Sequence, residues 1–524
     1  MNRRTSAAPR KRLPIGIQTF STLRDEGCYY VDKTPHIERL LDHGSRYFLS
    51  RPRRFGKSLL LDTIKALFEG REPLFRGLHI HDRWDWTKRH PVLRLSFGSG
   101  SFMEPGYLHG NLMAQLDRVE RSAGVSSGYA TAPERFGELI ELLREQAGER
   151  VVILVDEYDK PMLDALGVPE AVRANRDYLR GLYATIKDFD EHVRFALLTG
   201  VSKFSKVNVF SGLNNLQDIT LDRRHADVCG YTDADLDRVF APELPGLDRS
   251  EVRRWYNGYS WLGDEGVYNP YDILLLFDTR EFRAHWFETG TPKFLIDMLI
   301  ERQVRSVDLD GMIGTEALLS TFDVDHIGIE ALLFQTGYLT IKGRDSDGGR
   351  TTYRLGYPNH EVRQSLNEHL LNALLPDPSR RLALASPLQR LFATNDFPGL
   401  EAAFRSIFAA IPHQWHARNE IANYEGYYAS VFHSCLAGHG LDVVAEDSSS
   451  RGSADIAVRL AGSAYVFEFK VVADQAEGRA MAQLKDRDYV AKYRLAGAAT
   501  HLVAVEFSKT TRNIVSFEVE SEAP

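Results

Sequence analysis

The chain has 524 residues, more than one hydrophobic core usually organises, so we expect about two or three domains. Its composition, 43% hydrophobic and 26% charged, is that of a soluble globular protein, and no apolar run approaches the roughly 20 residues of a membrane-spanning helix. The net charge of −8 excludes a globally basic surface, so contact with nucleic acid would need a local basic patch.

The N-terminus and the cysteines indicate where the protein resides. The basic residues of segment 1–12 are not followed by an apolar stretch, which predicts a flexible tail rather than a secretory signal. Cys28, Cys229 and Cys435 are isolated, without the spacing of a zinc site or a disulfide framework. We therefore expect a cytoplasmic protein that makes no contact with membranes.

Segment 45–68 predicts a strand, a basic loop and a helix, because apolar residues at 47–49 precede a run with helical spacing. Such a junction directs backbone N–H groups and the positive end of a helix at one point, which suits the phosphates of a nucleotide. Lys57 would neutralise phosphate charge, and the Ser58 hydroxyl would bind Mg²⁺. The loop itself would be formed by Arg53, Arg54, Phe55 and Gly56. The motif departs from G-x-x-x-x-G-K-[ST] because Arg51 occupies the first glycine position.

An apolar run at 151–155 ends in two carboxylates. At a strand end beside the phosphate loop, Asp156 would hold Mg²⁺ through water and Glu157 would polarise an attacking water. The alternative is a strand that simply ends in solvated acids. A further apolar run ends at Thr199, which is expected where a sensor of the γ-phosphate would lie.

Short apolar runs bounded by turn residues predict five strands in the N-terminal half. They lie at 45–50, 91–97, 151–155, 193–198 and 218–221. With helical segments between them, these strands predict an α/β fold with a parallel sheet flanked by helices. Arg223 and Arg224 follow the fifth strand and are either a charge-stabilising finger or ordinary surface arginines.

The middle of the chain predicts three smaller parts. Residues 230–306 are helical and rich in aromatic side chains, which predicts a lid with an aromatic core rather than a base-stacking platform. Within 307–380, an apolar run at 331–342, a turn signal and a strand at 353–355 predict a helix followed by a hairpin, similar to a winged-helix module. Such modules bind DNA or pack against a nucleotide site. Residues 381–420 predict a helical connector.

The last segment, 421–524, predicts the order helix, three strands, helix and strand. The helices are expected at about 424–436 and 474–495, and the strands at 441–445, 454–460, 465–472 and 501–507. Asp455 opens the second strand. Glu468 and Lys470 lie two apart on the third strand, so both project from one face. The alternating residues Phe467, Phe469 and Val471 would fill the core.

Carboxylates and a lysine on one buried face are costly to desolvate unless they pair or bind a cation. Asp455 and Glu468 would bind a divalent cation, and Lys470 would orient or deprotonate a water. Hard oxygen ligands favour Mg²⁺ or Mn²⁺ over zinc. The alternative is a sheet with ordinary surface charges, because patterns of this kind are frequent.

These motifs resemble bacterial AAA-ATPase-like proteins that carry a C-terminal PD-(D/E)XK nuclease domain. The resemblance covers nearly the whole chain beyond the first dozen residues, and it rests on segments 51–58, 154–161, 198–203, 210–215 and 255–259, together with the C-terminal pattern. It implies a P-loop ATPase domain over 13–229 with the sheet order 5-1-4-3-2. A loop without the first glycine is typical of this family.

The resemblance also implies a restriction-endonuclease-like α/β domain at 421–524, with Glu425 approaching the metal from the first helix and Gln483 lining the site. It implies ATP and Mg²⁺ as cofactors, nucleic acid as substrate with DNA or RNA open, and leaves homo-oligomerisation open. We expect an ATPase whose nucleotide state controls a metal-dependent nuclease, with a role in defence or in a mobile element. The alternative is a nucleotide-gated switch that binds nucleic acid or protein without cutting.

Overall fold

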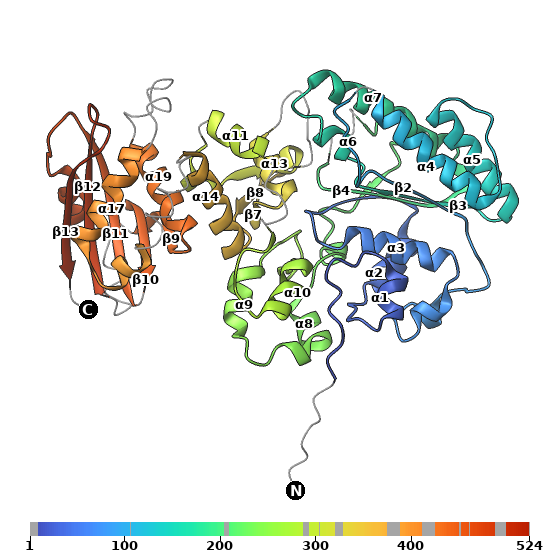
Figure 1. Ribbon diagram of the computed structural model, residues 1–524, viewed down its shortest axis with the longest axis horizontal. Coiled ribbons are helices and arrows are strands. Elements are labelled where there is room, and N and C mark those ends of the chain that lie inside the picture. Colours follow the sequence, from blue (N-terminus) through green and yellow to red (C-terminus); the bar gives the residue numbers. More distant parts are fainter. Residues whose placement is uncertain are drawn as a thin grey trace, which may run out of the picture. The chain divides into compact units, whose positions relative to one another are not determined.

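The computed structural model describes residues 9–104, 106–203, 209–286, 293–302, 304–319, 328–374, 388–410, 425–449, 452–460, 462–487 and 499–522 (Figure 1). The chain divides into two units. Unit 1 comprises Met1–Trp286 and Met312–Asn359, and unit 2 comprises Phe287–Gly311 and His360–Pro524. The middle of the chain therefore contributes to both units. The five domain boundaries drawn from the sequence remain proposals.

Unit 1 is built on a parallel sheet with the order β2-β3-β4-β1-β5. Its strands are β1 (Arg46–Ser50), β2 (Val92–Ser96), β3 (Val151–Asp156), β4 (Val193–Gly200) and β5 (Gln217–Asp218). The predicted strands and the order 5-1-4-3-2 are confirmed. β5 is shorter than predicted, because the Asp218 side chain accepts the Thr220 N–H at 2.9 Å and turns the chain.

Helices cover both faces of this sheet (Figure 1). One face carries α1 (Phe20–Asp25), α2 (Thr34–His43) and α3 (Lys57–Phe68), and the other carries α4 (Tyr107–Ala123), α5 (Ala132–Ala147), α6 (Lys160–Leu163) and α7 (Pro169–Asp188). Every residue of β3 is buried, which explains its uninterrupted apolar sequence. The carboxyl ends of β1, β3 and β4 meet at one edge of the sheet.

The remaining part of unit 1 has an aromatic core and a small sheet. Helices α8 (Asp233–Val239), α9 (Arg249–Tyr256) and α10 (Pro270–Thr279) pack around buried Tyr256 and Tyr268, which confirms the predicted aromatic core. The small sheet has the order β6-β8-β7. It comprises β6 (Ile313–Thr315), β7 (Thr340–Asp347) and β8 (Arg350–Gly356), with α12 (Glu316–Leu319) and α13 (Ile329–Thr336) beside it in sequence. The predicted helix and hairpin are confirmed.

Unit 2 contains a mixed sheet with the order β13-β12-β11-β10-β9, in which only β11 and β12 pair in parallel. The strands are β9 (Asp442–Ser449), β10 (Gly452–Leu460), β11 (Ser463–Val472), β12 (Ala499–Ser508) and β13 (Ile514–Glu522). The helices are α11 (Lys293–Glu301), α14 (His360–Leu374), α16 (Leu388–Ala393), α17 (Phe397–Ala410), α19 (Glu425–Gly438) and α20 (Arg479–Arg487). The predicted order of α19, β9, β10, β11, α20 and β12 is confirmed, and β13 extends it.

The core of unit 2 contains Phe467, Phe469 and Val471, as the alternation along β11 predicted. Side chains of α16 and α17, from the segment expected to be a connector, belong to the same core. The helix predicted over 474–495 begins later, at Arg479, and residues 488–498 lie outside the described part of the chain.

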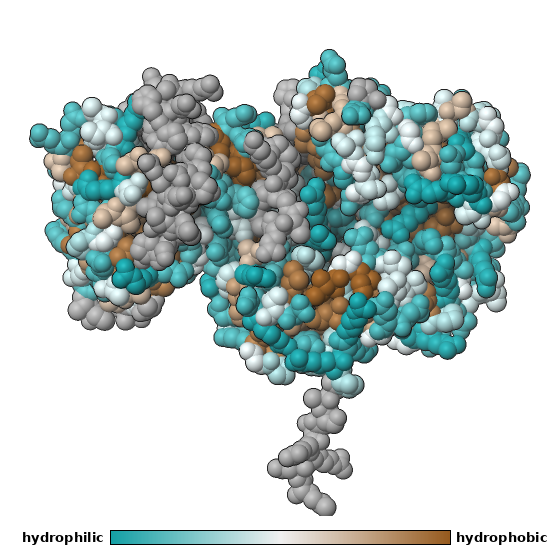
Figure 2. Space-filling view, in the orientation of Figure 1, coloured by the Kyte–Doolittle hydropathy of each residue, from teal (hydrophilic) through white to brown (hydrophobic). Residues whose placement is uncertain are grey.

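Hydrophilic residues cover most of the face seen in Figure 2. An apolar area lies over α10 and the neighbouring N-terminal segment, where the partly buried Leu13 and Ile15 pack against the core of α8 to α10. Among the residues that the structure describes, we find no helix whose length and hydrophobicity would let it span a bilayer.

Candidate nucleotide and nuclease sites

The phosphate loop connects β1 to α3 and ends at Gly56, which has a φ of +93° and precedes the first residue of the helix. Glycine adopts this left-handed conformation without steric cost. A Cβ atom at Gly56 would meet nothing within 4 Å, so the space above the loop is open. Arg53 and Arg54 are exposed beside it, and Ser58 is half-buried in the first turn of α3. The first N–H groups of the helix therefore border an open space that suits phosphate groups.

Lys57 is buried and bonded to its own loop. Its Nζ atom donates to the carbonyl oxygens of Arg51 at 2.8 Å and Pro52 at 2.9 Å. Burial lowers the pKa of Lys57, while the Asp156 and Glu157 carboxylates act in the opposite direction. The ammonium group is thus held among acids at the carboxyl edge of the sheet, with two neutral carbonyls as its present acceptors.

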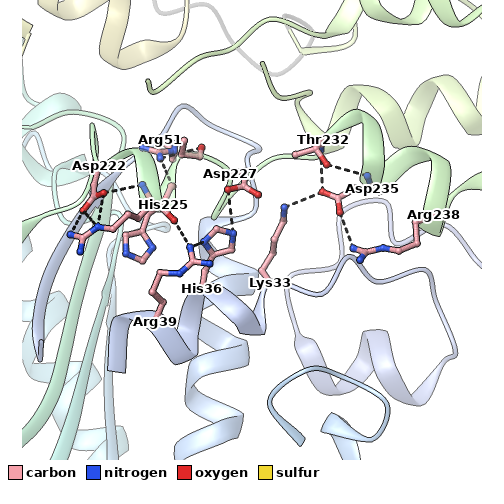
Figure 3. A network of polar contacts seen from close by, with 12 residues as sticks. Lys33, His36, Arg39, Arg51, Asp222, His225, Asp227, Thr232, Asp235 and Arg238 are labelled. Carbon is pink, nitrogen blue, oxygen red and sulfur yellow. Dashed lines mark hydrogen bonds and ion pairs between the residues drawn. The ribbon is translucent and has the colours of Figure 1, made fainter. Parts of the chain in front are cut away.

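Arg51, in the first glycine position, is fully buried. Its guanidinium donates to the carbonyl oxygens of Ser50 at 2.8 Å, Thr220 at 2.9 Å and His225 at 3.0 Å, and Figure 3 shows it beside His225. Burial lowers the pKa of Arg51 to about 10, so the side chain stays charged at neutral pH. The sequence showed only that the first glycine is missing, and no local pattern indicated that Arg51 anchors the loop.

Aromatic side chains from beyond α9 pack against the same loop. The Phe55 ring lies edge-on to the Tyr259 ring, with centroids 4.8 Å apart, and to the Trp261 ring at 5.3 Å. The Arg54 guanidinium lies 4.7 Å from the centroid of the Tyr271 ring. The sequence predicts these aromatics in a lid packed on the ATPase domain. They do lie against the phosphate loop, where Phe55 acts as an apolar anchor.

Asp156 and Thr199 lie side by side at the ends of β3 and β4. The Thr199 hydroxyl donates to Asp156 Oδ1 at 3.1 Å, and Arg94 donates to Asp156 Oδ2 at 3.4 Å. Glu157 follows with a φ of +53°, and its carboxylate lies 3.6 Å from where a Cβ atom on Gly98 would be. Burial raises the pKa of Glu157. The predicted pair of acids and the predicted sensor are thus brought together.

These residues fit a magnesium nucleotide. An open loop, a helix start and a buried lysine would bind the phosphates, while Ser58 and Asp156 offer the hard oxygen ligands that Mg²⁺ prefers. Arg223 and Arg224 are exposed and pair with Asp264 at 2.6 Å and Asp222 at 2.6 Å, respectively.

In unit 2, Lys470 links two of the predicted acids. Its Nζ atom donates to Glu468 Oε1 at 3.1 Å and to Glu425 Oε2 at 3.1 Å, and Glu425 is the first residue of α19. Burial acts to lower the pKa of Lys470, but the Glu468 and Glu425 carboxylates outweigh it and leave that pKa raised. The helix and β11 therefore meet through this lysine.

Asp455 joins the same group through the backbone, since its Oδ2 atom accepts the Phe469 N–H at 2.8 Å. It does not open its strand as predicted. β10 begins three positions earlier, at Gly452, because the strand pairs with β9 from that residue onward. Ile456 pairs with Phe467 in the antiparallel ladder of β10 and β11, so the neighbouring Asp455 lies beside Glu468 on the adjacent strand.

Glu468 is 1% exposed, and its Oε2 atom has no hydrogen-bond partner among the described residues. Burial, and then the Asp455 carboxylate, raise the pKa of Glu468 to about 7. A buried carboxylate oxygen without a partner is costly unless it binds a cation. No group of three or more His, Cys, Asp or Glu side chains in the described ranges could hold a metal. The residues that would hold a Mg²⁺ ion here are Glu468, through its Oε2 atom, and Asp455.

Gln483 lies on α20 at a half-buried position. The start of this helix is held by Glu506 of β12, a buried residue that sequence analysis missed. The Glu506 carboxylate accepts backbone N–H groups from Glu477 at 2.6 Å, Gly478 at 3.2 Å, Arg479 at 2.6 Å and Ala480 at 3.3 Å. An acid inside the apolar run at 502–507 was the signal that could have revealed it.

Comparisons with known proteins agree with this architecture. Residues 14–210 match a family model described as "Predicted AAA-ATPase", and residues 423–517 match the PD-(D/E)XK nuclease superfamily. A protein of Azotobacter chroococcum mcd 1, described as "Uncharacterized protein in vnfD 5'region", is 56% identical over 513 residues, which cover 98% of this chain and 99% of that protein. The chain belongs to the bacterial AAA-ATPase-like proteins with a C-terminal PD-(D/E)XK nuclease domain.

Both candidate sites of this AAA-ATPase-like protein fall inside the matched ranges. The first range contains Lys57, Asp156 and Thr199, and the second contains Asp455 and Lys470. The likeness to the Azotobacter protein extends through the middle region between the two ranges. Both matched domains therefore lie in one continuous chain, which the Azotobacter protein resembles over nearly its whole length.

Proposed function

We propose that this protein binds and hydrolyses ATP and that its nucleotide state controls a Mg²⁺- or Mn²⁺-dependent nuclease in unit 2. The observation that carries the proposal is Glu468, a buried acid with a partnerless oxygen that shares Lys470 with Glu425. Beside a cation and a phosphodiester such a group would bind the metal and orient a water. Without a cation, the burial of these charges costs free energy. The resemblance supports a role in defence or in a mobile element.

At the nucleotide site, Lys57 exchanges its two loop carbonyls for phosphate oxygens, which are stronger acceptors because they are charged. Ser58 and Asp156 would hold Mg²⁺, which supplies positive charge at the β- and γ-phosphates. Glu157 orients the attacking water and receives its proton. The raised pKa of Glu157 favours that transfer at neutral pH.

At the nuclease site, Asp455 and Glu468 would hold the cation, which supplies charge neutralisation at the phosphodiester. Lys470 orients a water and is itself fixed by Glu425 and Glu468. Gln483 lines the site from α20. Nucleic acid, DNA or RNA, is the proposed substrate, and self-association of the chain is left to measurement.

Contacts within unit 1 support the proposed control. The Lys203 N–H, just beyond β4, donates to Gln335 Oε1 of α13 at 3.0 Å. A Cβ atom on Gly337 would lie 2.7 Å from Pro52 of the phosphate loop. Two loops of the nucleotide site thus contact the segment that leads along the chain into unit 2. A rearrangement of these loops would shift α13, which gives nucleotide binding a route to the rest of the protein.

The alternative function is a nucleotide-gated switch that binds nucleic acid or protein without cutting. It is favoured by the absence of a three-ligand metal group among the described residues. A cleavage assay separates the two functions. Wild-type protein is incubated with plasmid, single-stranded DNA and RNA, with and without ATP, Mg²⁺ and Mn²⁺. Cleavage that requires the metal supports the nuclease, whereas binding without cleavage in every state supports the switch.

The control of cleavage by nucleotide is tested with Lys57→Ala and two variants of Gln335. Both Gln335→Leu and Gln335→Glu lose the Nε2 donor to the Leu319 carbonyl. Only Gln335→Leu also removes the acceptor of the Lys203 N–H, so Gln335→Glu serves as its control. We expect Lys57→Ala and Gln335→Leu to lose the difference in cleavage rate with and without ATP. If cleavage depends on ATP equally in all variants, the proposed control of cleavage by nucleotide is contradicted.

A further inference from the structure

Asp159 is a buried carboxylate that the proposed function leaves without a role. It is 1% exposed, and its Oδ2 atom accepts three hydrogen bonds from the two residues that follow β4. The donors are the Val201 N–H at 3.0 Å, the Ser202 N–H at 2.6 Å and the Ser202 hydroxyl at 2.7 Å. Burial raises the pKa of Asp159, whereas the bonds from Ser202 act to lower it. An acid this buried is retained at a cost that its hydrogen bonds must offset.

The turn that Asp159 holds carries Glu157. The φ of +53° at Glu157 is unfavourable for a residue with a side chain and persists only where the surroundings impose it. Tyr158 supplies part of that constraint. Its N–H donates to the Thr199 carbonyl at 3.0 Å, and its hydroxyl donates to the Ser202 carbonyl at 3.0 Å.

The end of β4, just before the residues that Asp159 binds, carries Thr199. The Thr199 hydroxyl donates to Asp156. The two turns pack tightly together at Gly200. A Cβ atom there would lie 2.5 Å from Asp159 Oδ1 and 2.6 Å from a Tyr158 ring carbon, so only glycine fits. The turn with the candidate base and the strand end with the candidate sensor are therefore joined as one unit.

We propose that Asp159 is a positioning residue for ATP hydrolysis, because it locks the turn carrying Glu157 to the strand end carrying Thr199. The proposal rests on the proposed ATPase function. Because Asp159 is 1% exposed, it would act through Glu157 and Thr199 rather than by direct contact with the nucleotide. It fixes the separation at which Glu157 and Thr199 act around the γ-phosphate, and a misplacement of about 1 Å in such a site costs on the order of 100-fold in rate.

The test compares Asp159→Ala, Asp159→Asn and Ser202→Ala with a control, Glu120→Ala. Glu120 is also a buried acid, bonded twice to Arg135 at 2.6 Å between α4 and α5. For each protein, kcat and KM for ATP, the thermal midpoint, and the dissociation constants of Mg²⁺·ADP with and without aluminium fluoride are measured. The last comparison reports on the arrangement around the γ-phosphate without turnover.

For Asp159→Ala we expect kcat to fall about 10- to 100-fold with KM nearly unchanged. The gain in affinity that aluminium fluoride gives to ADP should fall by a similar factor. Asp159→Asn keeps an acceptor oxygen and should retain most activity, and Ser202→Ala should be intermediate. Glu120→Ala should lower the thermal midpoint while leaving kcat of the folded protein unchanged.

The proposal is overturned if Asp159→Ala, or Ser202→Ala where the first variant does not fold, keeps the wild-type kcat and the wild-type response to aluminium fluoride. It is equally overturned if activity falls only in proportion to the folded fraction, as for the control. Wild-type protein that binds ATP without hydrolysing it would instead contradict the proposed ATPase function, so the two failures are distinguishable.

Discussion

The guanidinium carbon of Arg51 lies 4.2 Å from the centroid of the Trp261 ring. The residue that replaces the first glycine of the phosphate loop is thereby held under the loop, between an aromatic face and backbone carbonyls. A desolvated guanidinium over a tryptophan is a strong form of this contact. The loop is therefore shaped by an anchor below it.

This anchor predicts an effect of Arg51→Gln on stability. The variant leaves buried carbonyls without donors, so we expect unit 1 to lose about 1–3 kcal/mol and nucleotide binding to weaken as the loop loosens. Arg53→Ala changes an exposed side chain of the same loop and should alter stability by no more than about 0.5 kcal/mol. Thermal and urea unfolding of both variants test this, and equal stabilities would contradict the anchor.

The nucleotide site predicts two distinct defects. Lys57→Ala removes the cation nearest the phosphates and should abolish ATP binding, measured with a fluorescent ATP analogue. Glu157→Gln keeps the shape of the site but cannot accept a proton, so ATP should bind normally while turnover falls by about 100-fold or more. Undiminished turnover in Glu157→Gln would remove that residue from its assigned role.

At the nuclease site, we expect some substitutions to abolish cleavage without affecting metal binding. Asp455→Ala removes a hard oxygen ligand and should weaken Mn²⁺ binding and abolish cleavage, whereas Lys470→Ala should abolish cleavage but still bind Mn²⁺. Asp486→Ala, an exposed acid on α20, is the control and should change neither. Titration calorimetry and a cleavage gel measure the two properties. ATP hydrolysis should persist in all three variants.

Glu468 predicts a pH dependence of metal binding, since its pKa is raised to about 7. Below that pH the folded protein holds a proton that the cation must displace, so apparent Mn²⁺ affinity should fall by about tenfold per pH unit. Without metal, the folded state binds more protons than the unfolded state between the ordinary glutamate pKa and about 7. Its stability should therefore decrease as pH rises through that window and then level off. Glu468→Gln should remove both trends, and a flat wild-type affinity from pH 5 to 7 would refute the assignment.

The start of α20 predicts a large effect of Glu506→Ala. Four backbone N–H groups lose their acceptor, so we expect unit 2 to lose about 1–3 kcal/mol. Glu518→Ala, at an exposed position on the neighbouring β13, should be close to neutral. Thermal unfolding compares them. Hydrogen exchange at Arg479 and Ala480 should accelerate only in the first variant.

The regular parts of both sheets could be predicted from the sequence. An uninterrupted apolar run marked β3, a largely apolar run marked β4, and the alternation around Phe469 marked the core face of β11, because burial on two faces or one leaves a local pattern. The clustering of Lys57, Asp156 and Thr199 followed from where parallel strands end.

What the sequence did not reveal depends on partners far away along the chain. Arg51 is an anchor only because Trp261 and the His225 carbonyl reach it. Glu506 decides where α20 begins, although helical periodicity extended the helix to residue 474. Neither arrangement leaves a local periodicity, so reading segments one at a time could not find them.

The bonds from Lys57 to the carbonyls of Arg51 and Pro52 mean that the loop carries its own competitor for the ammonium group. The free energy that a ligand gains from Lys57 is only the difference between the bonds to its own oxygens and the bonds to these two carbonyls. Weakly charged ligands gain too little to displace the carbonyls. Adenosine and other ligands without phosphate charge should thus leave the bonds from Lys57 to these two carbonyls in place. A polyphosphate, whose charged oxygens are stronger acceptors, should displace both carbonyls from Lys57.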